Sequence, residues 1–448
     1  MADLYELTMA AAYFEEAFTA NATFELFVRS LPPERGFLVA AGLEQALDFL
    51  EQVHFEDDEI AYLRRQPVFG HINTGFFEYL KEFRFTGEAW AVPEGTPIFG
   101  EEPLLRVTAP IMEAQMVETF LLSTLTFQTM IASKAARVVD AADRRPVVEF
   151  GSRRAHGPQA GILAARAAYI GGCAGTSNVA AGHGFGVPVF GTLAHSFIMA
   201  HNHEEQAFQR FQRLFPEHSV LLVDTYDTLA AVDKIIQADL HPRAIRLDSG
   251  NLAELSKQAR EKLDRAGLRE TQIFASGDLD EYAITDLLGR GAPIDAFGVG
   301  TALATSKDAP ALGGVYKLVD IESEGVPSYR AKFSEEKITY PGRKQVFRFA
   351  DPGETFRTDI IACAGEEFPS GSPLLVCVMR NGRRASPSPS LPSVRQYARE
   401  QQERLPPECR RLRQHPAYPV SFSHQLRGLL ADVRKQVQPE YSSSPPLP

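Results

Sequence analysis

Between residues 146 and 301 the sequence repeats one pattern, a short apolar segment that ends in a small or acidic residue and is usually followed by a helical stretch. Seven such segments occur, in the order PVVEFG, GCAGTSN, VPVFGT, SVLLVDTYDT, AIRLDSGN, QIFASGDL and IDAFGVGT. Short buried strands that alternate with helices indicate a parallel sheet. Seven units in succession favour a closed α/β barrel over an open sheet. Functional groups in such barrels lie where the strands end, and the polar residues of these segments are found there.

The sequence on either side predicts a second module of mixed α and β structure. Residues 88–107 form short strand-like pieces separated by proline and glycine. Thr108, with Pro110 in the first turn, is expected to begin a long helix. Residues 329–351 indicate strands around a Pro-Gly turn, and we expect them to rejoin the N-terminal module. The predicted organisation is the N-terminal part of the α+β module (1–108), the α/β barrel (109–309), the C-terminal part of the module (310–383), a linker with a C-terminal helical extension (384–440) and a disordered tail (441–448).

Composition excludes several classes of protein. The formal net charge is −11 and the sequence pI is near 5.6, so a basic surface for nucleic acid or anionic membranes is not expected. No run of about 18 uncharged apolar residues exists that could span a membrane. The first residues, MADLYELTMA, lack the basic start of a signal peptide, and the four cysteines form no C-x-x-C motif. We therefore expect a cytoplasmic protein without a nucleic-acid or membrane partner.

One histidine, His195, lies in the apolar run VFGTLAHSF. A lone histidine in such a run is more often a hydrogen-bonded core residue. The alternative is a nucleophile or an acid/base at the end of a barrel strand. Asp224, at the end of another predicted strand, would then orient His195, because a carboxylate that accepts from one ring nitrogen raises the basicity of the other.

Two further segments offer groups for an anionic, ring-shaped ligand. In EFGSRRAHG, Arg153 and Arg154 follow a strand that ends at Phe150. The arginines are either a solvated pair or a bidentate site for a carboxylate or phosphate, and Phe150 can stack on a flat ring. The glycines of FGVGT, with Thr301, form a candidate phosphate turn at a helix start.

Two acids, Asp248 in RLDSGN and Asp278 in ASGDLD, also follow predicted strands. Either could be an ordinary turn or helix-cap residue. Alternatively they bind sugar hydroxyls or help to hold Mg²⁺, which prefers oxygen ligands and often bridges to substrate phosphates.

Taken together, the motifs resemble one family. They are DLYELTM, FELFVRSLP, EFGSRRAHGP, GTSNVAAG, GTLAHSF, VDTYDT, IRLDSGN, SGDLDE, FGVGTAL, PGRKQVFR and HPAYPVSFSHQLRGL. Their order over nearly the whole chain is similar to that of the nicotinate phosphoribosyltransferases. The resemblance implies the type II phosphoribosyltransferase fold, an irregular α/β barrel with a second α+β module formed from the N- and C-terminal segments.

The same resemblance implies transfer of the phosphoribosyl group of 5-phosphoribosyl-1-diphosphate to nicotinate, giving nicotinate mononucleotide and diphosphate in the first step of NAD synthesis from nicotinate. It implies coupling to hydrolysis of ATP as a co-substrate, through transient phosphorylation of a histidine that matches His195. It also implies Mg²⁺ as cofactor and a head-to-tail homodimer with shared active sites.

Residue roles carried over by the resemblance fall into two groups. Tyr5, supplied by the partner subunit, and Phe150 match the aromatic residues on the two faces of the pyridine ring. The other substrate-binding positions are Arg153, Arg246, Thr192 and Ser196. The phosphoribosyl- and phosphate-binding positions are Arg29, Asp248, Ser249, Gly250, Gly277, Asp278, Gly298, Gly300, Thr301 and Lys344, with Asp248 and Asp278 also the candidate metal ligands.

The substrate preference rests on GTSNVAAG. It offers Thr176, Ser177 and Asn178 and no carboxylate, and an acid there would repel the carboxylate of nicotinate. The alternatives are a nicotinamide phosphoribosyltransferase, a decarboxylating quinolinate phosphoribosyltransferase and a catalytically silent, metabolite-binding member of the family.

Overall fold

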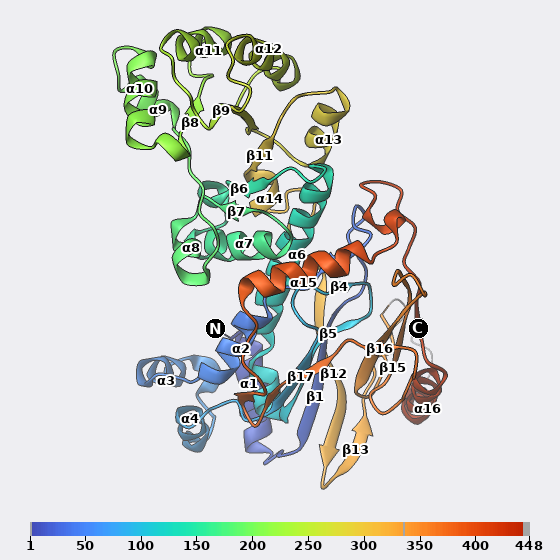
Figure 1. Ribbon diagram of the computed structural model, residues 1–448. Helices are drawn as coiled ribbons and strands as arrows, with labels where there is room; N and C mark the ends of the chain where they lie inside the picture. Colours follow the sequence, from blue (N-terminus) through green and yellow to red (C-terminus); the bar gives the residue numbers. More distant parts are fainter. Residues whose placement is uncertain (1, 335–336, 442–448) are drawn as a thin grey trace, which may run out of the picture. The chain divides into compact units, whose positions relative to one another are not determined.

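Segments from both ends of the chain fold together in the computed structural model, which describes residues 2–334 and 337–441 (Figure 1). The chain divides into two compact units. The terminal unit comprises Met1–Thr129, Ala311–Ser390 and Glu400–Pro448, and the barrel unit comprises Met130–Pro310 and Leu391–Arg399. The division between the units lies at 129/130, whereas the sequence predicted a boundary at 108/109. Of the predicted disordered tail, Tyr441 ends the last helix and residues 442–448 lie outside the described part of the chain.

The terminal unit is built on an antiparallel sheet that joins the two ends of the chain. Its strand order is β13 (Val326–Tyr329), β12 (Gly314–Ser323), β1 (Asn21–Val28), β5 (Pro103–Pro110), β3 (Glu88–Ala91), β17 (Val376–Arg380) and β18 (Arg383–Arg384). Strand β1 pairs with β5 on one side and with β12 on the other, and all its residues except the first are buried. This confirms the predicted α+β module formed from the N- and C-terminal segments.

Smaller sheets and helices complete the terminal unit. One sheet has the order β16 (Ser372–Pro373), β14 (Lys344–Ala350), β15 (Phe356–Cys363) and β19 (Val420–Phe422), and β2 (Leu38–Val39) pairs with β4 (Pro97–Ile98). The helices are α1 (Leu4–Glu15), α2 (Leu43–Gln52), α3 (Asp57–Arg64), α4 (Thr74–Lys81), α5 (Ile111–Met116), the first part of α6 (Glu118–Ala141), the end of α15 (Leu391–Glu403) and α16 (His424–Tyr441).

The predicted helix start at Thr108 is wrong. Strand β5 continues to Pro110, which pairs with Asn21 of β1, so Thr108 lies inside the strand and donates or accepts a hydrogen bond with Thr23 across the sheet. Helix α5 begins at Ile111. The reason is long-range strand pairing, which the local capping pattern does not reveal.

The barrel unit contains a sheet in which every strand pair is parallel. Its order is β7 (Gly175–Thr176), β6 (Val147–Glu149), β11 (Ala296–Val299), β10 (Gln272–Ala275), β9 (Ala244–Leu247) and β8 (Val220–Leu222). The helices between and around them are α7 (Pro158–Ile170), α8 (Val179–Phe185), α9 (His195–Met199), α10 (Glu204–Leu214), α11 (Thr228–Gln237), α12 (Leu252–Arg265), α13 (Glu281–Gly289) and α14 (Thr301–Ala304). The predicted parallel α/β architecture is confirmed.

The barrel is irregular at one predicted strand. Residues 187–192 make only an isolated bridge, between Val189 and Thr176. Val189 is 49% exposed and Phe190 is 39% exposed, so this segment lacks the covering that a central strand would have. Among the described residues, no helix is both long and apolar enough to cross a lipid bilayer.

A buried cluster of charges fixes α13 to the second part of α6 in the barrel unit. Glu281 is fully buried and lies 2.6 Å from Nζ of Lys134 and 2.9 Å from Nε of Arg137. Burial would raise the pKa of Glu281, but the charge and hydrogen bond of Lys134 and the hydrogen bond of Arg137 lower it. Paired in this way, the buried charges are compensated.

Candidate active site

A cavity of about 540 Å³ opens at the carboxyl ends of the parallel strands of the barrel unit. It brings together the predicted site residues Phe150, Arg153, Thr192, Arg246, Asp248, Gly277, Asp278, Gly298, Gly300 and Thr301. They come from strands β9 and β11, from the segments that follow β6, β9, β10 and β11, and from the loop before α9. Parallel strands place their carboxyl ends at one edge, and ligands of α/β folds bind there.

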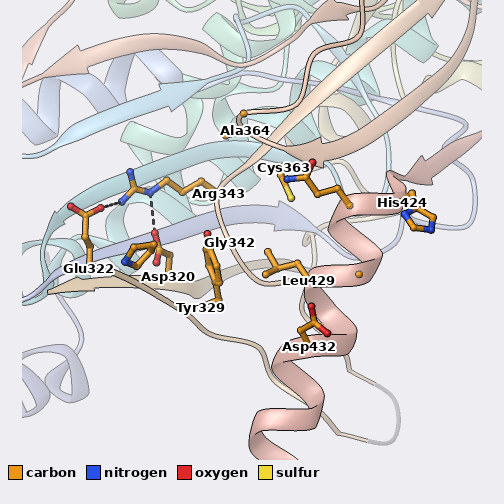
Figure 2. A pocket seen from close by; sticks show the side chains of 14 residues that line it. Asp320, Glu322, Tyr329, Gly342, Arg343, Cys363, Ala364, His424, Leu429 and Asp432 are labelled. Carbon is orange, nitrogen blue, oxygen red and sulfur yellow. Dashed lines mark hydrogen bonds and ion pairs between the residues drawn. The ribbon is translucent and has the colours of Figure 1, made fainter. Parts of the chain in front are cut away.

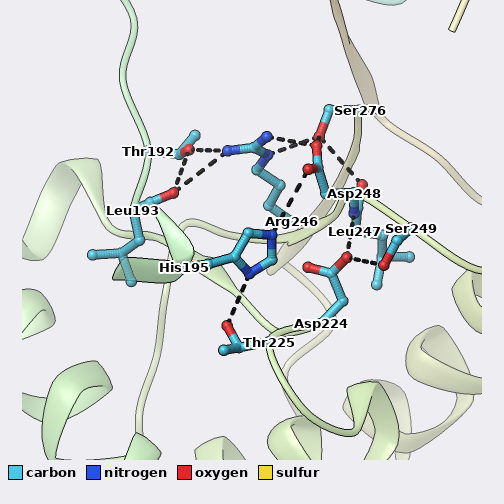
Figure 3. A network of polar contacts seen from close by, with 10 residues as sticks. All are labelled: Thr192, Leu193, His195, Asp224, Thr225, Arg246, Leu247, Asp248, Ser249 and Ser276. Carbon is cyan, nitrogen blue, oxygen red and sulfur yellow. Dashed lines mark hydrogen bonds and ion pairs between the residues drawn. The ribbon is translucent and has the colours of Figure 1, made fainter. Parts of the chain in front are cut away.

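The centre of the site is Arg246 of β9, shown in Figure 3. Its Nε donates to Oγ of Ser276 (2.7 Å), Nη1 to Oγ1 of Thr192 (2.8 Å) and to the carbonyl of Leu193 (3.4 Å), and Nη2 to Oδ1 of Asp248 (2.6 Å). These bonds use four of the five N–H donors of the guanidinium. Arg246 therefore ties the loop before α9 to the ends of β9 and β10, and a substrate anion would meet the remaining N–H or displace one of these acceptors.

Asp248 is the acid that this network holds. Its Oδ1 accepts from both Arg246 and Ser276, the latter at 2.6 Å. Burial alone would raise the pKa of Asp248, but the hydrogen bond from Ser276 and the charge of Arg246 lower it below its usual value. Asp248 is therefore a carboxylate at neutral pH. Asp278 lines the same cavity, is exposed and has no hydrogen-bond partner among the described residues.

An aromatic wall borders this network. Cζ of Arg246 lies 5.7 Å from the ring centroid of Phe150, and the rings of Phe150 and Phe274 are 5.6 Å apart. A Cβ on Gly298 would lie 2.7 Å from Cδ2 of Phe150 and 2.8 Å from Cε1 of Phe274. Glycine is required at 298 because the two rings pack directly against the β11 backbone.

His195 is the first residue of α9, and its side chain is 44% exposed, which excludes the interpretation as a buried core histidine. Nδ1 lies 3.1 Å from Oγ1 of Thr225, and Nε2 lies 3.9 Å from Oδ2 of Asp248 (Figure 3). The ring is thus hydrogen-bonded to a hydroxyl group at Nδ1, and a carboxylate lies beyond hydrogen-bond distance at Nε2.

The prediction that Asp224 orients His195 is wrong. Oδ2 of Asp224 accepts from the backbone N–H of Asp248 (3.1 Å) and from Oγ of Ser249 (2.5 Å), and Oδ1 has no hydrogen-bond partner among the described residues. Because β8 and β9 are neighbouring parallel strands, the loop after β9 offers donors directly beside Asp224. The histidine contact is made instead by the next residue, Thr225.

Five predicted residues of the barrel unit do not line the cavity: His195 and Asp224, described above, and Ser196, Ser249 and Gly250. Ser196 is exposed on α9, and Ser249 and Gly250 lie in the loop after β9. Gly250 has φ +81°, a left-handed conformation that favours glycine. Ser249 and Gly250 therefore shape the loop that Asp224 anchors.

The remaining predicted residues belong to the terminal unit, and Lys344 needs a correction. Its Nζ lies 2.8 Å from Oε2 of Glu25 and donates to the carbonyls of Tyr340 and Gly342, both at 2.8 Å. Lys344 is 4% exposed, so its three donors are used inside the protein and the geometry does not support the predicted contact with diphosphate. The cause is β14, whose first residue packs beside buried Glu25 of β1.

Arg29 and Tyr5 are more accessible than Lys344. Arg29 is half-buried, with one 3.4 Å hydrogen bond to the carbonyl of Ile338. Tyr5 is 45% exposed on α1. Partial burial and the nearby acids Glu118 and Glu6 raise the pKa of Tyr5 to about 12, so its hydroxyl stays protonated at neutral pH.

A second cavity, of about 600 Å³, lies in the terminal unit and is shown in Figure 2. Arg343 lines it and pairs with Asp320 (3.0 Å) and with Glu322 (2.7 Å), and Asp432 lies 3.5 Å from Lys435. Arg343 is therefore engaged by two acids of the protein, and the cavity contains none of the predicted site residues. The barrel cavity is therefore the candidate active site.

The ligands available for Mg²⁺ are carboxylate oxygens at the barrel cavity. Among the described residues, no group of three or more His, Cys, Asp or Glu is arranged to hold a metal ion. Asp248 and Asp278 line one cavity, and Asp224, whose Oδ1 has no hydrogen-bond partner among the described residues, accepts from the backbone N–H of Asp248. This set fits an ion bound by one or two carboxylates together with phosphate oxygens and water, as Mg²⁺ commonly is.

Sequence reasoning missed three residues of this site. Ser276 and Thr225 each follow a strand end as small polar residues beside a predicted acid, which is the only signal the sequence offers for them. Glu149 is fully buried and accepts hydrogen bonds from Oγ1 of Thr176 (2.6 Å) and from the backbone N–H of Gly151. Burial raises the pKa of Glu149. The two hydrogen bonds lower it, but burial has the larger effect. Glu149 fixes the turn that presents Phe150 and Arg153.

Comparisons with known proteins agree with this architecture. Three family models match successive parts of the chain: the nicotinate phosphoribosyltransferase (NAPRTase) N-terminal domain at residues 1–126, the quinolinate phosphoribosyl transferase C-terminal domain at 131–309 and the nicotinate phosphoribosyltransferase C-terminal domain at 368–430. Two solved structures are similar: human nicotinic acid phosphoribosyltransferase (TM-score 0.85, 28% identity, 97% of this chain and 100% of that chain) and nicotinate-nucleotide pyrophosphorylase from Pyrococcus furiosus (0.73, 27%, 90% and 95%).

Curated relatives match over nearly their full length. The chain is 49% identical over 440 residues to nicotinate phosphoribosyltransferase pncB2 of Mycobacterium tuberculosis, covering 96% of this chain and 93% of that protein. It is 39% identical over 454 residues to the nicotinate phosphoribosyltransferase of Bacillus subtilis, with coverages of 94% and 92%. On these findings, the chain belongs to the nicotinate phosphoribosyltransferase family.

Proposed function

We propose that this protein transfers the phosphoribosyl group of 5-phosphoribosyl-1-diphosphate to nicotinate, coupled to ATP hydrolysis through a phosphorylated His195. The products are nicotinate mononucleotide and diphosphate, and the step begins NAD synthesis from nicotinate. The observation that carries the proposal is the barrel cavity, where an aromatic wall, arginines and two carboxylates meet beside a half-exposed histidine. Family membership supports the same reaction. We place the enzyme in the cytoplasm.

Nicotinate would bind with its ring against Phe150 and its carboxylate toward Arg153 or Arg154, which line the same cavity. Selection of the acid over the amide rests on the neighbouring segment. Thr176 is buried and bonded to Glu149, and the Asn178 amide donates to Ser152, so of this predicted trio only Ser177 lines the cavity. No carboxylate is presented from that segment to repel the substrate.

The second face of the ring would be covered by Tyr5 of a second copy in a homodimer. Its exposure on α1 and its protonated hydroxyl suit a stacking partner that carries no charge. Holding the ring between two aromatic side chains orients the pyridine nitrogen, which is already nucleophilic.

In the transfer, the bond between the anomeric carbon and the diphosphate oxygen breaks and its electron pair leaves on the diphosphate. The pyridine nitrogen supplies the pair for the new C–N bond. The turn from Gly298 to Thr301 would hold the 5′-phosphate, and the ribose hydroxyls would bond Asp248 and Asp278. These two acids would also hold Mg²⁺, which when bound offsets the negative charge that develops on the diphosphate. Arg29 is the basic residue of the terminal unit that we retain for diphosphate binding.

The test is a product assay on the purified full-length chain with 5-phosphoribosyl-1-diphosphate and Mg²⁺, with and without ATP. Nicotinate, nicotinamide and quinolinate are supplied in parallel. We expect nicotinate mononucleotide from nicotinate alone, formed faster with ATP. The quinolinate arm is needed because residues 131–309 match the quinolinate transferase domain, and release of carbon dioxide from quinolinate would favour that activity. Nicotinate binding without product from any base would instead indicate a silent family member.

A further inference from the structure

The imidazole of His195 has one hydrogen-bond partner among the described residues, the hydroxyl of Thr225. Oγ1 of Thr225 lies 3.1 Å from Nδ1, while Nε2 faces Oδ2 of Asp248 at 3.9 Å, beyond hydrogen-bond distance. Figure 3 shows Thr225 and Asp248 on opposite sides of the ring. The orientation of the ring therefore depends on a single side-chain hydroxyl.

We propose that Thr225 positions His195 for phosphorylation by ATP, a role that rests on the proposed phosphohistidine route. Thr225 holds the ring through Nδ1 and fixes which nitrogen carries the lone pair that attacks. In this role Thr225 neither contacts the substrate nor transfers a proton to it. It acts through His195.

The segment that carries Thr225 is anchored on both sides. Oδ2 of Asp224 accepts from the backbone of Asp248 and from Ser249, which fastens the start of the loop to the neighbouring strand end. Two residues after Thr225, the Asp227 side chain accepts from the backbone N–H of Ala230 at 2.8 Å and caps α11. Because hydrogen bonds fix the segment on both sides of Thr225, its hydroxyl can hold the His195 ring in one orientation.

The contact with Thr225 also decides which nitrogen can attack. Oγ1 of Thr225 lies 3.1 Å from Nδ1, in the direction from which a phosphorus atom would have to approach that nitrogen, so Nδ1 cannot attack while this contact is kept. In the tautomer with the proton on Nδ1, the Thr225 hydroxyl oxygen accepts that proton in a hydrogen bond. Nε2 then carries a lone pair with no hydrogen-bond partner among the described residues, and it faces Asp248, which lines the cavity.

Phosphorylation follows from that arrangement. The Nε2 lone pair forms a bond to the γ-phosphorus of ATP, and the bond from that phosphorus to the β,γ-bridging oxygen breaks, so that its electron pair leaves on ADP. Nδ1 keeps its proton and its hydrogen bond to Oγ1 of Thr225.

The experiment compares the full-length protein with Thr225→Val, which has the same shape without the hydroxyl, and with Thr225→Ser, which keeps it. Thr285→Val is the matched control, because the Thr285 hydroxyl bonds only the carbonyl of Glu281 within α13. Each protein receives γ-labelled ATP and Mg²⁺ with rapid quenching in alkali, and the label on histidine is followed with time. The position of phosphorus on the ring is read by ³¹P NMR of the denatured phosphoprotein.

We expect label on Nε2 alone in the wild type and in Thr225→Ser. Thr225→Val is expected to be labelled about tenfold more slowly, the effect of losing one orienting hydrogen bond, and to carry phosphorus on both nitrogens. A distribution over both nitrogens is a change that a general loss of stability would not produce. Thr225→Ala serves as a second variant with the same expected direction if Thr225→Val folds poorly.

Labelling of Thr225→Val at the wild-type rate, on the wild-type nitrogen, would overturn the positioning role and leave the phosphohistidine route intact. Wild-type label on Nδ1 alone would overturn the assigned tautomer and with it this role. Nicotinate mononucleotide formation by a wild type that carries no alkali-stable label would overturn the phosphohistidine route itself, which separates that failure from the first.

Discussion

The hydroxyl of Ser276 donates to Oδ1 of Asp248 at 2.6 Å, and the same oxygen of Ser276 accepts from Arg246 at 2.7 Å. One small side chain, 2% exposed just after β10, therefore keeps an arginine of β9 and the acid that follows β9 at fixed positions. Both of its partners line the barrel cavity. The precision of the site thus depends on a residue with no charge of its own.

Replacing Ser276 with alanine would leave the guanidinium of Arg246 and the carboxylate of Asp248 each without one partner. We expect kcat/KM for 5-phosphoribosyl-1-diphosphate to fall by about tenfold to a hundredfold, because unsatisfied buried polar groups cost about 1–3 kcal/mol. Steady-state kinetics measure the effect. Ser256→Ala is the control, since that buried hydroxyl bonds only the carbonyl of Ala253 in α12. Equal kinetics for the two variants would contradict the role given to Ser276.

At Gly298 the added methyl group of alanine would meet Phe150 and Phe274 at less than 3 Å. We expect Gly298→Ala to displace the Phe150 ring and to raise KM for nicotinate by about tenfold. A small displacement of the ring that stacks on the substrate weakens binding, because the contact depends on close packing. Gly289→Ala is the matched control, because a Cβ there has no atom within 4 Å. An unchanged KM for nicotinate in Gly298→Ala would show that Phe150 does not stack on the substrate.

A carboxylate introduced at Ser177 tests the basis of substrate choice. Ser177→Asp would place a negative charge in the cavity near the carboxylate of nicotinate, and we expect kcat/KM for nicotinate to fall at least about tenfold. Turnover of nicotinamide should fall less, because the amide carries no charge. Ser177→Asn has the same shape without the charge and should retain the preference for nicotinate. Loss of that preference in both variants would point to shape rather than charge.

Glu281 tests the stability of the barrel unit. Glu281→Gln removes the carboxylate paired with buried Arg137 and one of the two carboxylates paired with buried Lys134, the other being Asp308 at 2.7 Å. We expect a loss of about 3–5 kcal/mol in the free energy of unfolding. Because the folded-state pKa of Glu281 is lowered, its contribution is present above the unfolded value, about 4.3, and is lost as pH falls through the folded pKa. The melting temperature should therefore fall more between neutral and acid pH for the wild type than for Glu281→Gln.

The control for that measurement is Glu261→Gln, which removes the charge of an exposed acid of α12 that is paired with Arg265. Exposed pairs contribute about 0–1 kcal/mol, so its melting temperature should stay close to that of the wild type. If Glu261→Gln were as destabilising as Glu281→Gln, burial would not be the cause of the effect.

Much of the site was predictable because parallel strands concentrate their carboxyl ends at one edge. Phe150, Asp248, Asp278 and the glycines of FGVGT were assigned from strand-end positions or motif resemblance, and the structure places them in one cavity. His195 was correctly separated from the core, since its side chain is 44% exposed. These assignments rest on the order of strands and polar residues along the chain and on ordered sequence motifs.

Other assignments failed where a partner is far away in sequence. Lys344 has the charge of a phosphate ligand, yet it is buried against Glu25, 319 residues earlier in the chain. Thr108 has the pattern of a helix cap, yet it pairs with β1. Asp224 is an acid at a strand end, as a residue that orients a histidine would be, yet it accepts from the backbone N–H of Asp248 and from Ser249 in the loop after β9.

The sequence by itself determined the parallel α/β barrel, the rejoining of the two chain ends in one module and the family, because these follow from apolar periodicity and from ordered local motifs. Only the tertiary structure decided which neighbour of a candidate residue makes the contact: Thr225 rather than Asp224 on His195, Ser276 between Arg246 and Asp248, and Glu25 on Lys344. The physical reason is that hydrogen bonds depend on distances of about 3 Å and on donor direction, which residue type and spacing along one chain do not specify.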